Sequence, residues 1–163
     1  AIGVEGMSKP QNAGNLMRSA HAFGASFFFA IAPDVDFHGL RQSDTSEAAF
    51  HMPFYEYPDP GALALPRGCR LVGAELLPDA HDLPSFRHPA QAAYVFGPEK
   101  GSLSPALLAR CDDVVKIPAK FCVNVGIAGA LVMYDRMIAL GSFAERPVGT
   151  RGRAARKPAP AER

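Results

Sequence analysis

Cysteine is scarce in this sequence. Cys69, Cys111 and Cys122 are the three cysteines among 163 residues, and they are widely spaced with no CxxC pair. An odd number of separated thiols does not form a disulfide framework, and the paired thiolates of a structural zinc site are missing. The sequence therefore predicts no metal site and a reducing compartment, which we take to be the cytoplasm.

Long apolar runs are also missing. Asp135 and Arg136 interrupt the longest one, which falls short of the roughly 20 residues that a membrane-spanning helix needs. We see no signal peptide. Hydrophobic residues make up 48% of the chain and charged residues 20%, as in soluble globular proteins. We expect one domain with a sizeable core and no membrane segment.

The common catalytic and nucleotide-binding motifs are absent. The sequence contains no HExxH, no G-x-S-x-G, no GxGxxG and no GK[ST] loop, which argues against the zinc peptidases, serine hydrolases and nucleotide-binding folds that carry them. The five histidines pair with no recognisable motif, so each is interpreted as a surface or internally satisfied residue: His21, His38, His51, His81 and His88.

Charge is distributed unevenly although the net charge is only +1. Residues 146–163 carry a net charge of +5, whereas residues 1–145 carry −4. We therefore divide the chain into a folded domain, 1–145, and a basic tail, 146–163, that is expected to be disordered. Such a tail binds phosphate backbones without specificity or only keeps a protein soluble, and both interpretations stay open.

Apolar periodicity predicts alternating strands and helices. The expected strands are residues 2–4, 27–31, 54–57, 70–76, 93–96 and 114–117, and the expected helices are residues 12–23, 44–50, 105–111 and 125–140. Residues 60–65 are expected to form a helical turn, and residues 77–89 a loop interrupted by prolines. The order of elements indicates an α/β fold with a mostly parallel sheet flanked by helices.

The last predicted helix is the most apolar part of the chain. Asn124 is a good N-cap residue, and the residues after it are apolar on nearly every side, so the helix is expected to be buried. Gly126 and Gly129 would let another backbone approach closely. A core helix packed on a sheet explains this pattern, and so does a helix that lines a ligand pocket and a subunit contact.

Three polar or glycine-rich stretches come after predicted strands, where α/β sheets bind their ligands. In the first, residues 12–18, Gly14 and Arg18 are four residues apart and share one helix face. Arginine suits forked contacts with phosphate, although an ordinary surface arginine fits the spacing as well. In the second, residues 95–103, two glycines bracket a charged pair, as in a ligand-binding loop or an ordinary turn. The third is residues 117–124.

Taken together and in this order, the three stretches resemble the signature of the SpoU-type (TrmH-like) RNA ribose methyltransferases of the SPOUT superfamily. The family's motifs are Asn, Gly and Arg at the spacing seen in residues 12–18, then FGPE with a later Gly, then I-P-M followed by a short loop and S-L-N-V-S entering a helix. The resemblance spans residues 2–142. The third loop is shorter here, and Cys122 and Gly126 stand where the family has serines.

The resemblance implies a deep trefoil knot at the C-terminal end, although general topology rules argue against knots. It also implies a homodimer that acts on tRNA or rRNA, with S-adenosyl-L-methionine as cofactor in the knot. The cofactor would be held mostly by backbone groups, which suits the small and apolar residues present. The residues expected to contact it are Glu75, Leu76, Phe96, Gly97, Glu99, Gly101, Ile117, Pro118, Cys122 and Val123.

The same resemblance assigns catalytic positions to Asn12, Arg18, Glu99 and Asn124. An arginine stays protonated, so Arg18 is expected to hold an RNA phosphate or to stabilise the developing 2′-oxyanion, while a phosphate oxygen or water accepts the proton. Glu99 is expected to order the cofactor loop, or Arg18 across the dimer. Asn124 is expected to cap the last helix.

Two other interpretations remain. The chain could be a non-catalytic RNA-binding or assembly module that retains the fold, and the missing serines at Cys122 and Gly126 favour this alternative. A general nucleotide-binding α/β domain is the third interpretation, and it would require ATP or NAD to bind more tightly than S-adenosylmethionine.

Overall fold

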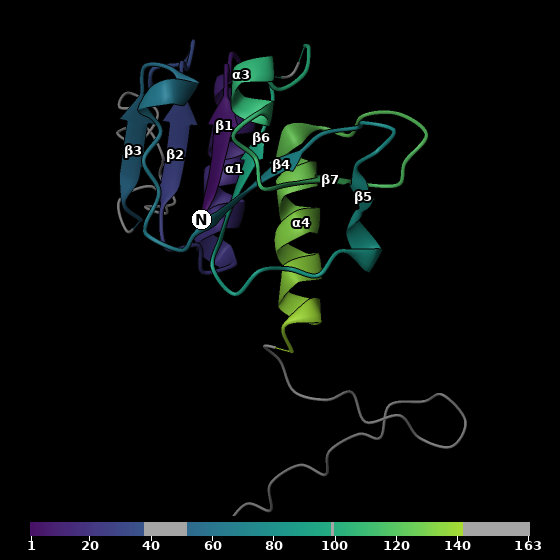
Figure 1. The fold of residues 1–163 in the computed structure, drawn as a ribbon. Coiled ribbons are helices and arrows are strands. Elements are labelled where there is room, and N and C mark those ends of the chain that lie inside the picture. The colour runs from purple at the N-terminus through teal and green to yellow at the C-terminus, as the bar shows by residue number, and fades with distance from the viewer. Residues whose placement is uncertain (38–51, 99, 142–163) are drawn as a thin grey trace, which may run out of the picture.

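The computed structural model of the chain describes residues 1–37, 52–98 and 100–141. Its centre is a seven-stranded sheet in the order β3-β2-β1-β6-β4-β7-β5 (Figure 1). Every strand pair among the described residues is parallel, which confirms the predicted class. The strands are β1 (Ile2–Glu5), β2 (Phe28–Ile31), β3 (Phe54–Tyr57), β4 (Arg70–Ala74), β5 (His81–Asp82), β6 (Ala92–Phe96) and β7 (Asp113–Lys116).

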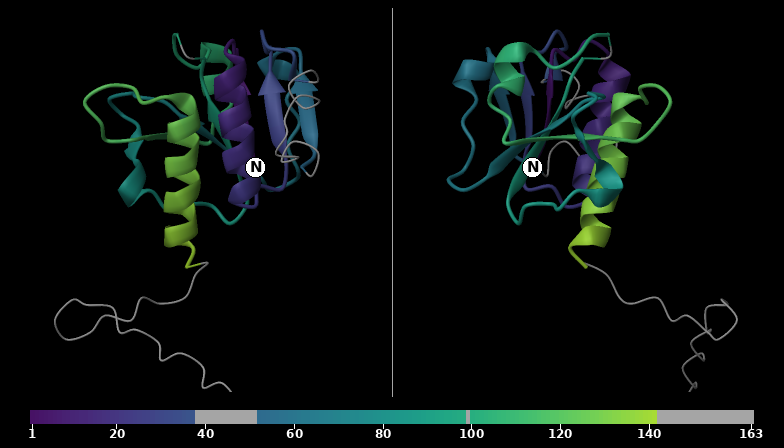
Figure 2. Two further views of the ribbon diagram at one scale, coloured as in Figure 1. Left: turned by 180° about the vertical axis from the view of Figure 1, so that it is seen from behind. Right: turned by 45° about the vertical axis from the view of Figure 1, so that its right-hand side comes forward.

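Helices cover the sheet. The two long helices, α1 (Pro10–Ala22) and α4 (Val125–Ala139), lie side by side on one face, as Figure 2 shows from behind. The short helix α3 (Pro105–Leu108) and the 3-10 turns η1 (Pro60–Ala62) and η2 (Leu83–Ser85) complete the described elements. Ser104 caps α3 as a serine is expected to, because its hydroxyl accepts a hydrogen bond from Leu107 N at 3.1 Å.

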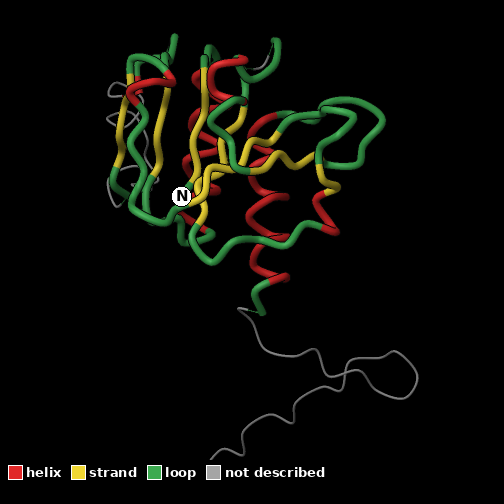
Figure 3. Tube along the Cα trace, in the orientation of Figure 1, coloured by secondary structure: helices red, strands yellow, loops and turns green. Residues whose placement is uncertain are grey.

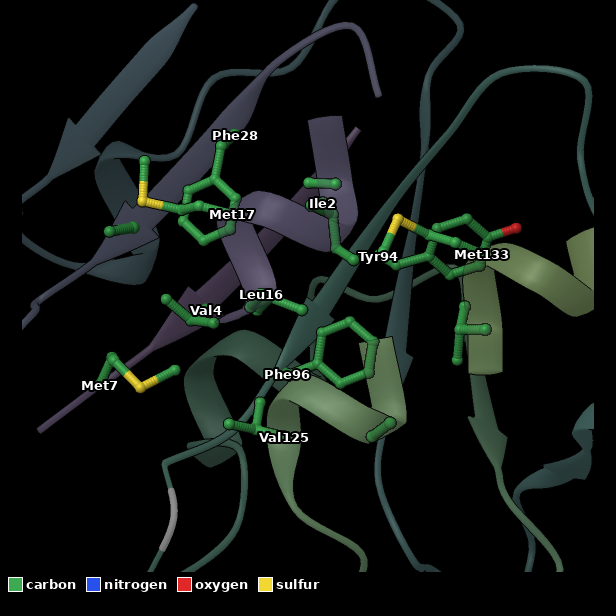
Figure 4. Packing of buried hydrophobic residues seen from close by; sticks show 14 of the residues in the cluster. Ile2, Val4, Met7, Leu16, Met17, Phe28, Tyr94, Phe96, Val125 and Met133 are labelled. Carbon is green, nitrogen blue, oxygen red and sulfur yellow. The ribbon is translucent and has the colours of Figure 1, made fainter. Parts of the chain in front are cut away.

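The strand alternation divides the core into two clusters, because successive side chains point to opposite faces of a sheet. Phe28 and Tyr94 belong to the cluster under α1 and α4, whereas Phe29 and Val95 belong to the cluster on the other face. Figure 4 shows the first cluster, with Leu16 of α1 close to the strand residues. The central strands are therefore buried on both faces, as their continuous apolar runs predict.

The α1–α4 contact depends on small residues in α4. Gly129 faces the buried Leu16 side chain so closely that a Cβ at this position would overlap it. At Gly126, a Cβ would lie 3.2 Å from the Cβ of Asn15. The small residues of α4 therefore make room for the side chains of α1, rather than for the close backbone approach that was expected.

The predicted start of α1 is wrong. The helix begins at Pro10 with Lys9 as its N-cap, and Asn12 is its third residue. Proline at the first helical position has a suitable fixed φ and lacks only an N–H that would be unpaired there anyway. The other end is as expected, since Gly24 follows the helix with φ of +72°.

Three other boundaries differ from the predictions. Residues 77–89 are not all loop, since they contain β5 and η2. The helix expected over 105–111 ends at Leu108, and the strand expected over 70–76 ends at Ala74, which leaves Glu75 and Leu76 beyond the sheet. Short elements of this kind depend on tertiary pairing more than on local propensity.

The expectation that α4 is buried all round is also wrong for the single chain. Ile127 is 56% exposed, and Leu131, Tyr134 and Ile138 are each just over 40% exposed. These four residues follow helical spacing along one side of α4 and are called the α4 apolar stripe below. The other side of the helix carries the buried residues Val125, Val132 and Met133.

Two of the predicted segments lie outside the described residues: the helix at 44–50 and the tail at 146–163. Within the described ranges, no helix has the length and apolar character that crossing a bilayer would need.

Candidate functional site

A pocket of about 410 Å³ opens where β4, β6 and β7 end and α4 begins. The loops after β4 and β7 extend together from this end of the sheet (Figure 3). Parallel strands place their carboxyl ends at one edge of the sheet, so segments far apart in the sequence meet there. The pocket is lined by Lys9, Asn12, Ala74, Glu75, Leu76, Phe96, Gly97, Pro98, Gly101, Val115, Ile117, Ala119, Phe121, Cys122, Val123, Asn124, Val125, Ala128 and Val132.

The pocket gathers most of the residues that sequence reasoning singled out. The expected cofactor contacts that line it are Glu75, Leu76, Phe96, Gly97, Gly101, Ile117, Cys122 and Val123, and the expected catalytic residues that line it are Asn12 and Asn124. Pro118 is exposed and does not line the pocket. Glu99 lies outside the described residues.

Asn124 and Asn12 join the two helices at the pocket. Asn124 Nδ2 donates to Asn12 Oδ1 at 2.8 Å, and Asn124 Oδ1 accepts from Gly126 N at 2.9 Å. The second bond is the expected N-cap of α4. The first bond explains why Asn12, which does not cap α1, is a buried polar side chain, since it is only 8% exposed.

The inner wall of the pocket is apolar. Phe96, Val115 and Val125 contribute buried apolar side chains. At Gly97, a Cβ would lie 3.0 Å from Leu103 N, so a side chain there would push into the loop. The pocket falls within the range of about 300–1,000 Å³ that is typical of ligand sites, and it offers an apolar slot next to backbone groups.

Charge in the pocket comes from few groups. Among the described lining residues, Glu75 is the one carboxylate and Lys9 the one cation. Glu75 Oε2 accepts from Leu103 N at 2.8 Å, and Oε1 accepts from Leu76 N at 3.1 Å. The exposed Lys100 and Lys120 flank the pocket loops, so an anionic ligand would meet cations beside the mouth of the pocket.

Arg18 does not line the pocket of its own chain. It is exposed on α1, one turn beyond Gly14, where a Cβ would meet no atom within 4 Å. The surface of α1 beside Gly14 is therefore open in the single chain.

Sequence reasoning did not single out Lys9, and it included Phe121 only as part of the third stretch, 117–124, although both residues line the pocket. Lys9 precedes α1 directly, and no motif distinguishes it from a surface lysine. Phe121 is 75% exposed, which is unusual for an aromatic residue, but the sequence carried no signal for its exposure. Their placement depends on how the loops fold back over the strand ends.

The comparisons with known proteins agree with this geometry. Residues 1–134 match the SpoU rRNA Methylase family, so the chain belongs to that family. A tRNA (guanosine(18)-2′-O)-methyltransferase of Thermus thermophilus is 26% identical over 140 residues, which cover 81% of this chain and 71% of that enzyme.

Solved structures have the same fold. The SpoU methyltransferase AviRb from Streptomyces viridochromogenes, in complex with AdoMet, has a TM-score of 0.74 at 25% identity and is matched over 86% of this chain. The TrmH/SpoU tRNA-modifying enzyme of A. aeolicus has a TM-score of 0.71 at 16% identity, over 86% of this chain and 75% of its own. This chain spans 57% of the AviRb chain.

Proposed function

We propose that this chain is an S-adenosyl-L-methionine-dependent RNA methyltransferase that transfers a methyl group to a ribose 2′-hydroxyl of tRNA or rRNA. The observation that carries the proposal is the pocket itself, where the ends of β4, β6 and β7 meet the Asn12–Asn124 pair. Membership of the SpoU family supports it, as does the likeness to an AdoMet complex of AviRb.

The residues present fit this cofactor. The apolar wall suits an adenine ring, and the backbone at Glu75–Leu76, Phe96–Gly97 and Cys122–Val123 borders the pocket with peptide groups. When bound, the cofactor supplies an electrophilic methyl group on its sulfonium. The protein must then hold the ribose oxygen about 3–3.5 Å from that carbon, and this positioning supplies much of the rate.

Arg18 is the proposed catalytic residue. A guanidinium remains protonated at any physiological pH, so it acts by binding an RNA phosphate or by stabilising negative charge that develops on the 2′-oxygen. A phosphate oxygen or water accepts the proton. Asn12 and Asn124 hold α1, which carries Arg18, against the start of α4. Glu99 is proposed to order the cofactor loop, or Arg18 across the dimer.

The chain is also proposed to act as a homodimer in the cytoplasm. The α4 apolar stripe supports the dimer, because an exposed apolar helix face is typical of a subunit contact. The ring of Phe23, directly after α1, packs edge-on against the ring of Tyr134, with 6.5 Å between the ring centroids, and it extends the exposed apolar surface beyond the α4 apolar stripe. In a dimer, Arg18 of one subunit can serve the pocket of the other.

The free thiols of Cys69, Cys111 and Cys122 support a reducing location, which cell fractionation tests.

A trefoil knot is proposed for the C-terminal part of the domain. Its support is that α4 lies against the segment between β5 and β6, since Arg136 donates to Pro89 O at 2.6 Å and to Ala90 O at 2.8 Å. Experimental electron density traced through residues 75–125 tests the threading. A path on which residues 118–124 pass outside the loop of residues 75–91 contradicts the knot.

The experiment for the function is transfer of tritiated methyl from S-adenosylmethionine to unmodified tRNA and rRNA, followed by digestion to nucleosides. We expect label in a 2′-O-methylnucleoside and a loss of at least a hundredfold in Arg18→Ala. Full activity of Arg18→Ala would show that the residue assignment is wrong. Cofactor binding without transfer to any RNA would favour the alternative, a non-catalytic RNA-binding module, which Cys122 and Gly126 in the serine positions support.

A further inference from the structure

Two carboxylates flank the loop that follows β6. In the sheet, β6 lies between β1 and β4. Glu5 is the last residue of β1, and Glu75 comes directly after β4. Because all three strands are parallel, both side chains lie at the same edge of the sheet as the described residues of the loop after β6, 97–98 and 100–104. This loop forms one wall of the pocket through Gly97, Pro98 and Gly101.

Both carboxylates bind consecutive residues at the end of this loop. Glu75 Oε2 accepts from Leu103 N at 2.8 Å. Glu5 Oε2 accepts from Ser104 N at 2.7 Å, and Glu5 Oε1 accepts from the Ser104 hydroxyl at 2.6 Å. These are short hydrogen bonds to ionised acceptors, the stronger kind. Glu5 is only 8% exposed. Burying a carboxylate without hydrogen-bond donors is unfavourable, and the Ser104 amide and hydroxyl supply those donors.

Two glycines make the conformation of this loop depend on these hydrogen bonds. Gly97 lies against the returning chain, where a Cβ would be 3.0 Å from Leu103 N and 3.2 Å from the carbonyl carbon of Ser102. Gly101 has φ of +118°, a conformation that side chains disfavour. The position of Leu103 N therefore sets the position of Gly97, which lines the pocket.

Glu75 also connects the loop to the segment after β4. Its Oε1 accepts from Leu76 N at 3.1 Å while Oε2 binds Leu103 N. Leu76 and Gly97 both line the pocket, so this one carboxylate sets the spacing between two of its walls. Glu5 connects the loop to α3 instead, because Ser104 is the N-cap of that helix.

We propose that Glu5 and Glu75 are positioning residues that together hold one wall of the cofactor pocket, formed by Gly97, Pro98 and Gly101, in its binding geometry. This inference rests on the proposed function, because the ligand held by that wall is S-adenosylmethionine. The carboxylates act through the Leu103 and Ser104 amides. Loss of either carboxylate loosens the loop and weakens cofactor binding, while the affinity for RNA is unchanged.

The test uses Glu75→Gln, Glu75→Ala and Glu5→Gln in the full chain, with Glu56→Gln as the matched control, since Glu56 is exposed on the edge strand β3. Backbone hydrogen exchange reports on residues 97–104, and calorimetry measures the Kd for S-adenosylmethionine. We expect faster exchange confined to that loop. We also expect a Kd raised about tenfold in Glu75→Ala and less in Glu75→Gln, which keeps one acceptor oxygen.

The outcomes separate this inference from the proposed function. Variants that bind S-adenosylmethionine as tightly as the wild type overturn the inference alone, and so does faster exchange throughout the domain, which would indicate general destabilisation. A wild-type chain that binds no S-adenosylmethionine overturns both. If Glu5→Gln does not fold, the Glu75 variants decide the result, because Glu75 is only half-buried at the pocket. In transfer assays, the KM for RNA should stay at its wild-type value.

Discussion

Asn124 makes two hydrogen bonds with one amide group, to Gly126 N and to Asn12 Oδ1. Replacing it with alanine should lower the free energy of unfolding by about 0.5–2 kcal/mol, because α4 loses its N-cap. Chemical denaturation measures the change, and Asn15→Ala, an exposed position on α1, serves as the control. Equal stability of Asn124→Ala and the wild type would contradict the prediction.

The thiols of Cys111 and Cys122 should differ strongly in reactivity. Burial raises the pKa of Cys111 to about 11, so only about one in a thousand of these thiols is ionised at pH 8. Cys122 is exposed and lines the pocket. We expect a disulfide reagent such as DTNB to label Cys122 first at pH 8, and S-adenosylmethionine to slow that phase.

The pH dependence gives a second check on the same thiols. Because the pKa of Cys111 is raised, its labelling rate should keep increasing about tenfold per pH unit from pH 8 towards 11. Cys122→Ser should remove the fast phase and leave this slow, pH-dependent phase in place. A fast phase that persists in Cys122→Ser would show that another thiol is accessible.

At the residue scale, the sequence predicted those roles that depend on local geometry. The Asn124 cap follows from the residue type at the start of an apolar helix. The Asn12–Asn124 bond does not, because the two residues are 112 positions apart and only the fold brings them together. The bonds from Glu5 to Ser104 could not be predicted either, because nothing in the local sequence distinguishes Glu5 from any other residue at the end of a strand.

At the element scale, α4 is fastened to the segment between β5 and β6. His88 is buried, with Nδ1 2.5 Å from the Tyr94 hydroxyl and Nε2 2.9 Å from Asp135 Oδ2. Arg136 binds two carbonyl oxygens of the same segment. These contacts hold α4 against the segment between β5 and β6.

Breaking this attachment should cost stability. His88→Phe keeps an aromatic ring but removes the partner of Asp135 and one partner of Tyr94, so we expect a loss of about 1–3 kcal/mol in the free energy of unfolding. Calorimetry measures the change, and His81→Phe, on the exposed strand β5, is the control. Equal losses in the two variants would show that the histidine hydrogen bonds are not responsible.

Strands with long apolar runs were predicted at nearly their observed positions, whereas β5 was not. β5 consists of His81 and Asp82 only, and neither residue favours a strand. It forms because His81 pairs with Val115 and Asp82 with Lys116 of β7. A pairing partner more than 30 residues away leaves no local pattern in the sequence.

At the scale of the whole molecule, the α4 apolar stripe should mediate dimer formation. Leu131→Asp places a charge in that stripe, so it should shift the protein from about twice the chain mass of 17.4 kDa to a monomer. Light scattering after size exclusion measures the mass. Tyr55→Asp, at a position 49% exposed on β3, is the control. A wild-type protein that is monomeric at micromolar concentration would contradict the proposed dimer.

The α/β class, the order of most elements and the three candidate stretches follow from the amino-acid sequence, because these depend on apolar periodicity, turn chemistry and motif spacing. The folded chain was needed to show which strands are neighbours, which side of α4 is exposed and which side chains bind the pocket loops. Those properties depend on contacts between residues that are distant in the chain, as in the bonds from Glu5 to Ser104 and from Asn124 to Asn12. Local propensity carries no information about such contacts, since the same side chains would be ordinary surface groups without their partners.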